Sequence, residues 1–154
     1  MFALENRQDD KRSRLINNLG PPLTLSVTTG GEILMPSCFD ASLRVFDAKG
    51  IKFKTFVLPL KVQFPQHAVE TRDKTYIVSC KQTSSPQNLH QLLELSADGA
   101  VIRDFSVDNL DRPLHIALFE NGGIILTDNT NHKIIVIDSQ MKWQRTLLCK
   151  HLII

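Results

Sequence analysis

The chain has 154 residues, 42% of them hydrophobic and 22% charged, which is ordinary for a folded domain. Eighteen basic and sixteen acidic residues leave a formal charge of +2, too small to indicate a nucleic-acid or membrane-surface partner. No window approaches the length of about 18 apolar residues that crosses a membrane, and residues 1–10 contain no apolar signal-peptide core. These features predict a cytoplasmic protein with no membrane partner.

An internal repeat covers most of the chain. Residues 22–57 align with residues 113–148 without a gap, and prolines, glycines and β-branched residues coincide along the alignment. A middle copy begins at Pro65. The repeat unit is therefore about 45 residues long, a period typical of stacked repeat architectures.

The predicted units follow one another along the chain. Residues 1–18 have mixed charge and are interpreted as a tail that can supply the outer strand of a preceding unit. The units then span 19–60, 61–110 with a loop insertion at 81–88, and 111–150. In the third unit, short segments rich in isoleucine, leucine and valine at 114–119, 124–127, 134–137 and 144–148 are separated by turn residues, which predicts four strands per unit.

Four-stranded units of this length are typical of the blades of a β-propeller. We therefore predict an all-β fold, a partial β-propeller of about three four-stranded antiparallel blades. Residues 134–137 are apolar without alternation, which indicates that both faces of a blade are covered by neighbours. Such a propeller is open unless missing blades complete it, or unless a second copy forms a homodimer with a closed ring.

The third unit carries a motif that resembles a known repeat. Pro113 opens its first strand, and the turn between its second and third strands contains Asp128, Asn131, His132 and Lys133. This pattern resembles the NHL repeat, whose members include the C-terminal propellers of tripartite-motif ubiquitin ligases. The first two units depart from it, with Ser37 and Cys80 at the position of Asp128. We expect Asp128 to accept backbone hydrogen bonds across the turn and Asn131 to adopt the left-handed conformation.

The resemblance implies a protein-binding scaffold, as in substrate recognition by a ubiquitin ligase. No GxSxG, HExxH, P-loop or GxGxxG motif is present, so we expect a protein without enzymatic activity and without a cofactor. Loops carry the contacts of such scaffolds. The candidate contact residues lie in the insertion, and they are Lys81, Gln82, Thr83, Ser84, Ser85 and Asn88.

Two other functions stay open. Single-stranded RNA binding would use the interleaved basic and aromatic residues Lys52, Phe53, Lys54, Phe56, Lys61 and Phe64. A metal-dependent lyase or hydrolase would use His67 and His115, which occupy equivalent positions in the second and third units. Because a zinc site needs three or four ligands, we interpret both histidines as half-buried imidazoles bonded to the backbone of a neighbouring blade.

Overall fold

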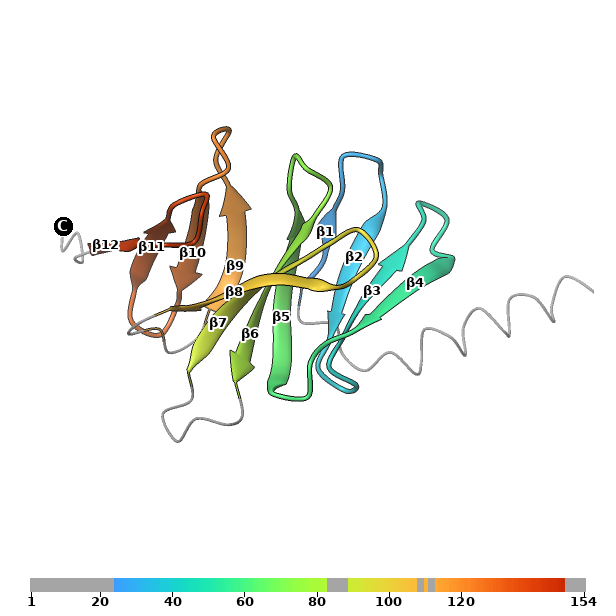
Figure 1. Cartoon of the computed structure of the whole chain (residues 1–154), viewed down its shortest axis with the longest axis horizontal. Coiled ribbons are helices and arrows are strands. Elements are labelled where there is room, and N and C mark those ends of the chain that lie inside the picture. Colours follow the sequence, from blue (N-terminus) through green and yellow to red (C-terminus); the bar gives the residue numbers. More distant parts are fainter. Residues whose placement is uncertain (1–23, 83–88, 108–109, 111–112, 149–154) are drawn as a thin grey trace, which may run out of the picture.

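The computed structural model describes residues 24–82, 89–107, 110 and 113–148. They form three four-stranded antiparallel sheets that follow one another along the chain (Figure 1). The strands are β1 (Ser26–Val27), β2 (Ile33–Ser37), β3 (Ser42–Phe46), β4 (Lys52–Val57), β5 (Val62–Glu70), β6 (Tyr76–Gln82), β7 (His90–Leu95), β8 (Val101–Val107), β9 (Pro113–Leu118), β10 (Ile124–Asp128), β11 (Lys133–Ile137) and β12 (Gln144–Leu148). The predicted all-β fold of four-stranded antiparallel units is confirmed.

Each strand pairs with the next strand along the chain, so every sheet is built from consecutive hairpins. The connections β1–β2, β5–β6 and β9–β10 lie at one end of the sheets, drawn at the top of Figure 1 and called here the hairpin end. The connections β2–β3 and β4–β5, the end of β6 and the start of β7 lie at the opposite end, called here the loop end. No helix in the described part of the chain is long and apolar enough to cross a membrane.

The middle sheet is covered on both faces. Tyr76 and Val78 on β6 point into a core shared with the first sheet, whereas Ile77, between them, points into a core shared with the third sheet. The strand β7 alternates in the same way, with Leu93 in the first core and Leu92 in the second. Burial of one such leucine or isoleucine side chain stabilises the fold by about 1.5–3 kcal/mol. Apolar residues at successive positions of β6 and β7 therefore serve two interfaces on one sheet. The run 134–137, from which two covered faces were expected, lies instead in the third sheet, where only Ile135 and Ile137 are fully buried.

The third sheet has one covered and one open face. Ile124, Leu126, Ile135 and Ile137 are fully buried against the middle sheet. The residues between them, Ile125, Ile134 and Val136, are only half-buried. Their counterparts in the repeat alignment, Leu34, Leu43 and Val45 of the first sheet, are fully buried against the middle sheet.

Candidate functional site

The first strands of the three sheets lie next to one another and are joined by hydrogen bonds. The strand β5 packs against both β1 and β9. The hydroxyl groups of Thr24 and Ser26 donate to the carbonyl oxygens of Gln66 and Ala68 on β5. On the other side of β5, the backbone N–H of Ile116 on β9 donates to Nδ1 of His67 over 3.0 Å. Polar side chains therefore connect the sheets along this line of inner strands.

His67 and His115 lie side by side on these strands. Their ring centroids are 5.2 Å apart, with the rings nearly perpendicular. His67 is 6% exposed, whereas His115 is exposed. Burial, and secondarily the charge that His115 can carry, lower the pKa of His67 to about 4. His67 is therefore neutral at pH 7, and because its Nδ1 accepts a hydrogen bond, its proton lies on Nε2.

His67 is bonded to the backbone of the neighbouring sheet, as interpreted, but it is buried and not half-buried. The interpretation was wrong for the burial of His115, whose side chain is exposed. Within the described ranges, no group of three or more His, Cys, Asp or Glu side chains lies close enough together to hold a metal ion. His67 and His115 are only two side chains, fewer than the three or four ligands that a zinc site needs.

The NHL-like turn connects β10 and β11. The Asp128 carboxylate is buried and accepts hydrogen bonds from the backbone N–H of Asn131, over 3.3 Å, and from its side-chain amide, over 2.8 Å. The left-handed residue of this turn is His132, with φ of 52°, and not Asn131 as expected from the sequence. Ala41, the counterpart of His132 in the first sheet, has φ of 47°. The left-handed conformation occurs at this position with two unrelated side chains. The geometry of the turn therefore determines it, and not the type of residue.

Replacing Asp128 with alanine is expected to lower the free energy of unfolding by about 2 kcal/mol, because a buried carboxylate that accepts two hydrogen bonds from the turn is lost. Asn131→Ala is the milder control and should cost about 1 kcal/mol, because the backbone bond from residue 131 to Asp128 survives. Urea denaturation followed by circular dichroism measures both. Equal midpoints for the two variants would contradict a central role of the carboxylate.

Four large apolar side chains are exposed at the loop end of the first two sheets. Phe39 is 84% exposed and Val57 78%, Leu60 is fully exposed, and Phe64 is 49% exposed. We call these four residues the loop-end patch. Their segments converge, since the Leu58 N–H donates to the Ala41 carbonyl oxygen and the Cys38 thiol donates to the Pro65 carbonyl oxygen. Exposed apolar residues gathered in this way are typical of interaction sites.

The predicted binding loop begins beside this patch. Lys81 and Gln82, at the end of β6, pair with Gln63 and Val62 on β5. The Lys81 ammonium lies 6.0 Å from the centre of the Phe64 ring. The other candidate loop residues, Thr83, Ser84, Ser85 and Asn88, lie outside the described residues.

Of the residues that suggested RNA binding, those whose side chains the structure describes do not all lie at the surface. Phe56 is buried in the core between the first and second sheets, where it cannot stack on a base. Lys61 forms an ion pair with Asp104 over 3.1 Å. The side chains of Lys52 and Phe53 lie outside what the structure describes. Of the remaining residues, Phe64 belongs to the loop-end patch.

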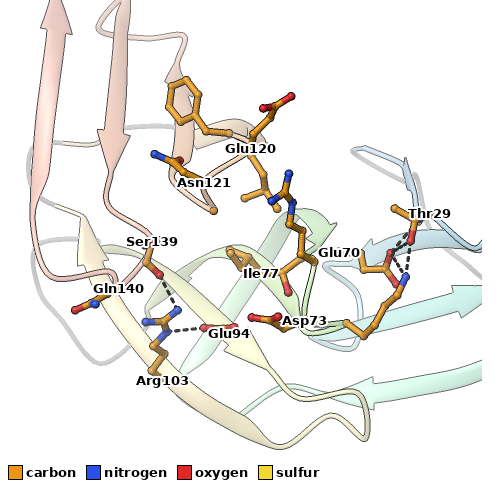
Figure 2. A pocket seen from close by; sticks show the side chains of 16 residues that line it. Thr29, Glu70, Asp73, Ile77, Glu94, Arg103, Glu120, Asn121, Ser139 and Gln140 are labelled. Atoms are coloured by element: carbon orange, nitrogen blue, oxygen red, sulfur yellow. Dashed lines mark hydrogen bonds and ion pairs between the residues drawn. The ribbon is translucent and has the colours of Figure 1, made fainter.

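A cleft of about 920 Å³ opens at the hairpin end (Figure 2). Its walls come from the β5–β6 turn, from the β9–β10 turn, from Glu94 and Arg103 on β7 and β8, and from the β11–β12 turn. Arg103 joins two of these walls, since it pairs with Glu94 over 2.5 Å and donates to the Ser139 carbonyl oxygen over 2.9 Å. At the edge of the cleft, Glu70 accepts hydrogen bonds from the backbone and the hydroxyl group of Thr29 in the first sheet.

Consecutive four-stranded sheets with adjoining first strands define a propeller-like fold, and solved structures share it. Streptogramin B lyase is 20% identical, with a TM-score of 0.61, over 80% of this chain and 39% of the lyase. A catalytically inactive virginiamycin B lyase from Staphylococcus aureus, with quinupristin, is 20% identical with a TM-score of 0.61 over 80% of this chain and 40% of that chain. A protein of unknown function from Bacteroides caccae is 14% identical with a TM-score of 0.58 over 82% of this chain and 45% of that chain.

The chain thus spans less than half the length of each of these structures, and at such identity the likeness shows the fold alone. No model of a known protein family matches the sequence, and none of the curated proteins matches it. The resemblance to NHL repeats is therefore supported as a propeller-like fold and not as membership of that family.

The expectation of a protein without enzymatic activity is corrected by these structures. It was inferred from a resemblance to binding scaffolds and from the lack of sequence motifs. Streptogramin B lyase is an enzyme with this fold. One fold can carry a binding site in one protein and a catalytic site in another. The fold therefore gives no support to the expectation that this protein lacks enzymatic activity.

Proposed function

We propose that this chain binds another protein and that the loop-end patch is the contact surface. The observation that supports the proposal is the exposure of Phe39, Val57, Leu60 and Phe64 on converging segments at one end of the sheets. Large apolar and aromatic side chains at the centre of an interface carry most of its binding energy. Lys81, beside Phe64, favours a partner segment that combines apolar side chains with an acidic residue.

The test replaces Phe39 and Leu60, the two most exposed residues of the patch. Phe39→Ser combined with Leu60→Ser should leave the fold intact, because both side chains lie in solvent. Proteins retained by the immobilised wild-type chain should be lost with the double variant, and the affinity for a purified partner should fall by about 30-fold or more. Isothermal titration calorimetry measures that affinity.

The matched control is Ile102→Ser, which removes an exposed apolar side chain from β8, outside the patch. A partner retained equally by the wild-type chain, the control and the double variant would contradict the proposal. Sedimentation of the same three proteins shows whether the patch binds a different protein or a second copy of this chain. A dimer that forms with the wild-type chain and dissociates in the double variant would assign the patch to self-association and would also overturn the proposal.

A further inference from the structure

A side chain at one repeat position connects each of the first two sheets to the next sheet. Thr24, His67 and His115 occupy this position in the three repeat units. The Thr24 hydroxyl group donates to the Gln66 carbonyl oxygen of the second sheet. Nδ1 of His67 accepts from the Ile116 N–H of the third sheet. His115 is exposed, and no sheet follows the third one in the described part of the chain, so His115 continues the series without a next sheet to bind.

The open face of the third sheet matches a face that is covered in the first sheet. Ala117 and Leu147 extend this open face, because they pair with Ile125 and Ile134 on the neighbouring strands. The counterpart of Leu147 in the repeat alignment is Phe56, which lies in the core against the middle sheet. Phe56 is 8% exposed, whereas Leu147 is 41% exposed. The third sheet therefore offers the apolar face that binds a following sheet elsewhere in the chain.

The first sheet has an open face of the complementary kind. Leu25 lies at the repeat position of Ile116, and Val27 lies at that of Leu118. Ile116 and Leu118 belong to the core between the second and third sheets. In contrast, Leu25 is 56% exposed and Val27 is 69% exposed. The first sheet thus offers the apolar positions that a preceding sheet covers in the third sheet.

A buried ion pair lies on the same face of the first sheet. Register places Arg44 on the face of Val27, at the repeat position of Ile135. The Arg44 guanidinium is buried and pairs with the Asp40 carboxylate over 2.6 Å. Because this charge is already paired and largely removed from water within the chain, a sheet that covers the face adds little desolvation cost.

We propose that two copies of this chain close a ring, with the third sheet of each copy packed on the first sheet of the other copy. The two open faces cannot meet within one chain, because closed propellers have at least four blades. Three sheets from each of two copies make six. Nδ1 of His115 then accepts a hydrogen bond from the Leu25 N–H of the other copy, as Nδ1 of His67 does from Ile116 within the chain.

Sedimentation equilibrium of the full chain between about 1 and 100 µM should show a monomer and a dimer in exchange. Ala117→Arg adds a charged side chain to the open face of the third sheet, where Ala117 is exposed in the single chain. It should raise the dissociation constant of the dimer by about 100-fold, because both contacts of the ring contain this position. A wild-type chain that stays monomeric over this range, or that assembles beyond a dimer, would overturn the proposal.

The matched control is Ala97→Arg, which adds the same side chain to an exposed position of the β7–β8 turn, outside both open faces. This variant should dimerise like the wild-type chain. Dissociation of the control equal to that of Ala117→Arg would overturn the proposal, since added charge alone would then separate the copies.

Val27→Arg tests the open face of the first sheet and should also give a monomer. A mixture of the Val27→Arg and Ala117→Arg chains should dimerise again, because one contact of the pair is then built from two unchanged faces. This dimer should be weaker than that of the wild-type chain, which has two such contacts. A Val27→Arg chain that still dimerises alone would place two third sheets together and would overturn the proposal.

Hydrogen exchange reports on the contact itself. The Leu25 amide should exchange more slowly in the wild-type dimer than in the Ala117→Arg chain, because it donates to His115 of the other copy. Equal exchange rates would overturn the assigned contact. The Phe39→Ser, Leu60→Ser variant should dimerise normally, since this interface does not use those two residues, which keeps it separate from the protein-binding function proposed above. Loss of the dimer in that variant would overturn the ring.

Discussion

Replacing Gly99 with alanine is expected to lower the free energy of unfolding by about 3 kcal/mol. Gly99 lies in the β7–β8 turn with φ of 90°, a conformation that residues with a side chain rarely adopt. A Cβ atom there would lie 2.3 Å from Cδ1 of Phe56. The Phe56 ring is itself buried against Tyr76, with ring centroids 5.6 Å apart, so it has little room to move. The variant therefore strains the turn and disturbs the core between the first and second sheets.

Gly50→Ala is the matched control for this prediction. Gly50 occupies the same place in the β3–β4 turn, with φ of 76° and a backbone hydrogen bond to Asp47 like that of Gly99 to Ser96. No atom lies within 4 Å of a Cβ built at Gly50. We expect this variant to cost about 1 kcal/mol, from backbone strain alone. Urea denaturation that gives equal losses for the two variants would contradict the role assigned to Phe56.

Lowering the pH from 7 to 4 is expected to destabilise the protein by on the order of 3 kcal/mol through His67 alone. The pKa of His67 falls from 6.5 to about 4 in the folded chain, mainly because the imidazole is buried. The unfolded chain therefore binds more protons between these two values, and stability falls as the pH drops through this range. The contribution of His67 is fully present above pH 6.5 and changes no further below about pH 4.

Urea denaturation at several pH values, with the wild-type chain and the His67→Leu variant, isolates this effect. Leucine leaves the Ile116 N–H without its acceptor, so the variant should be less stable at pH 7. Its stability should nevertheless depend less steeply on pH between 6.5 and 4, because it has no group at this position to protonate. Parallel pH profiles for the two proteins would contradict the assignment.

The fold was predictable because it depends on local and repeated features. Short β-branched segments separated by glycine and asparagine turns predict strands, and the alignment of residues 22–57 with 113–148 predicts equivalent sheets. The pattern of residues 89–95 does not distinguish helix from strand, but their place in the repeat predicts a strand, and the structure has the strand His90–Leu95 there. His67 and His115 occupy equivalent positions of the repeat, and their rings lie 5.2 Å apart in the structure because stacked repeats bring equivalent positions together.

The binding surfaces were harder to predict because they depend on the exposure of individual side chains. Phe56 and Phe64 look alike in the sequence, yet Phe56 is buried and Phe64 belongs to the loop-end patch. A signal was present in Phe39, a large apolar residue in the turn before Asp40, where a polar residue is usual. The cleft combines turns from β5–β6, β9–β10 and β11–β12, and only their placement in space brings Asp73 and Glu120 to one opening.

The unequal faces of the sheets give the stack a direction. The first and second sheets present the faces that carry Leu34 and Ile77 to the sheet that follows, and the second and third sheets contact the preceding sheet through their other face. A sheet added beyond β12 must therefore offer a surface like that of Tyr76 and Val78 to Ile125, Ile134 and Val136. Two copies that met through their third sheets would bring like faces together. A ring built from two copies would have to join them head to tail, through two identical contacts.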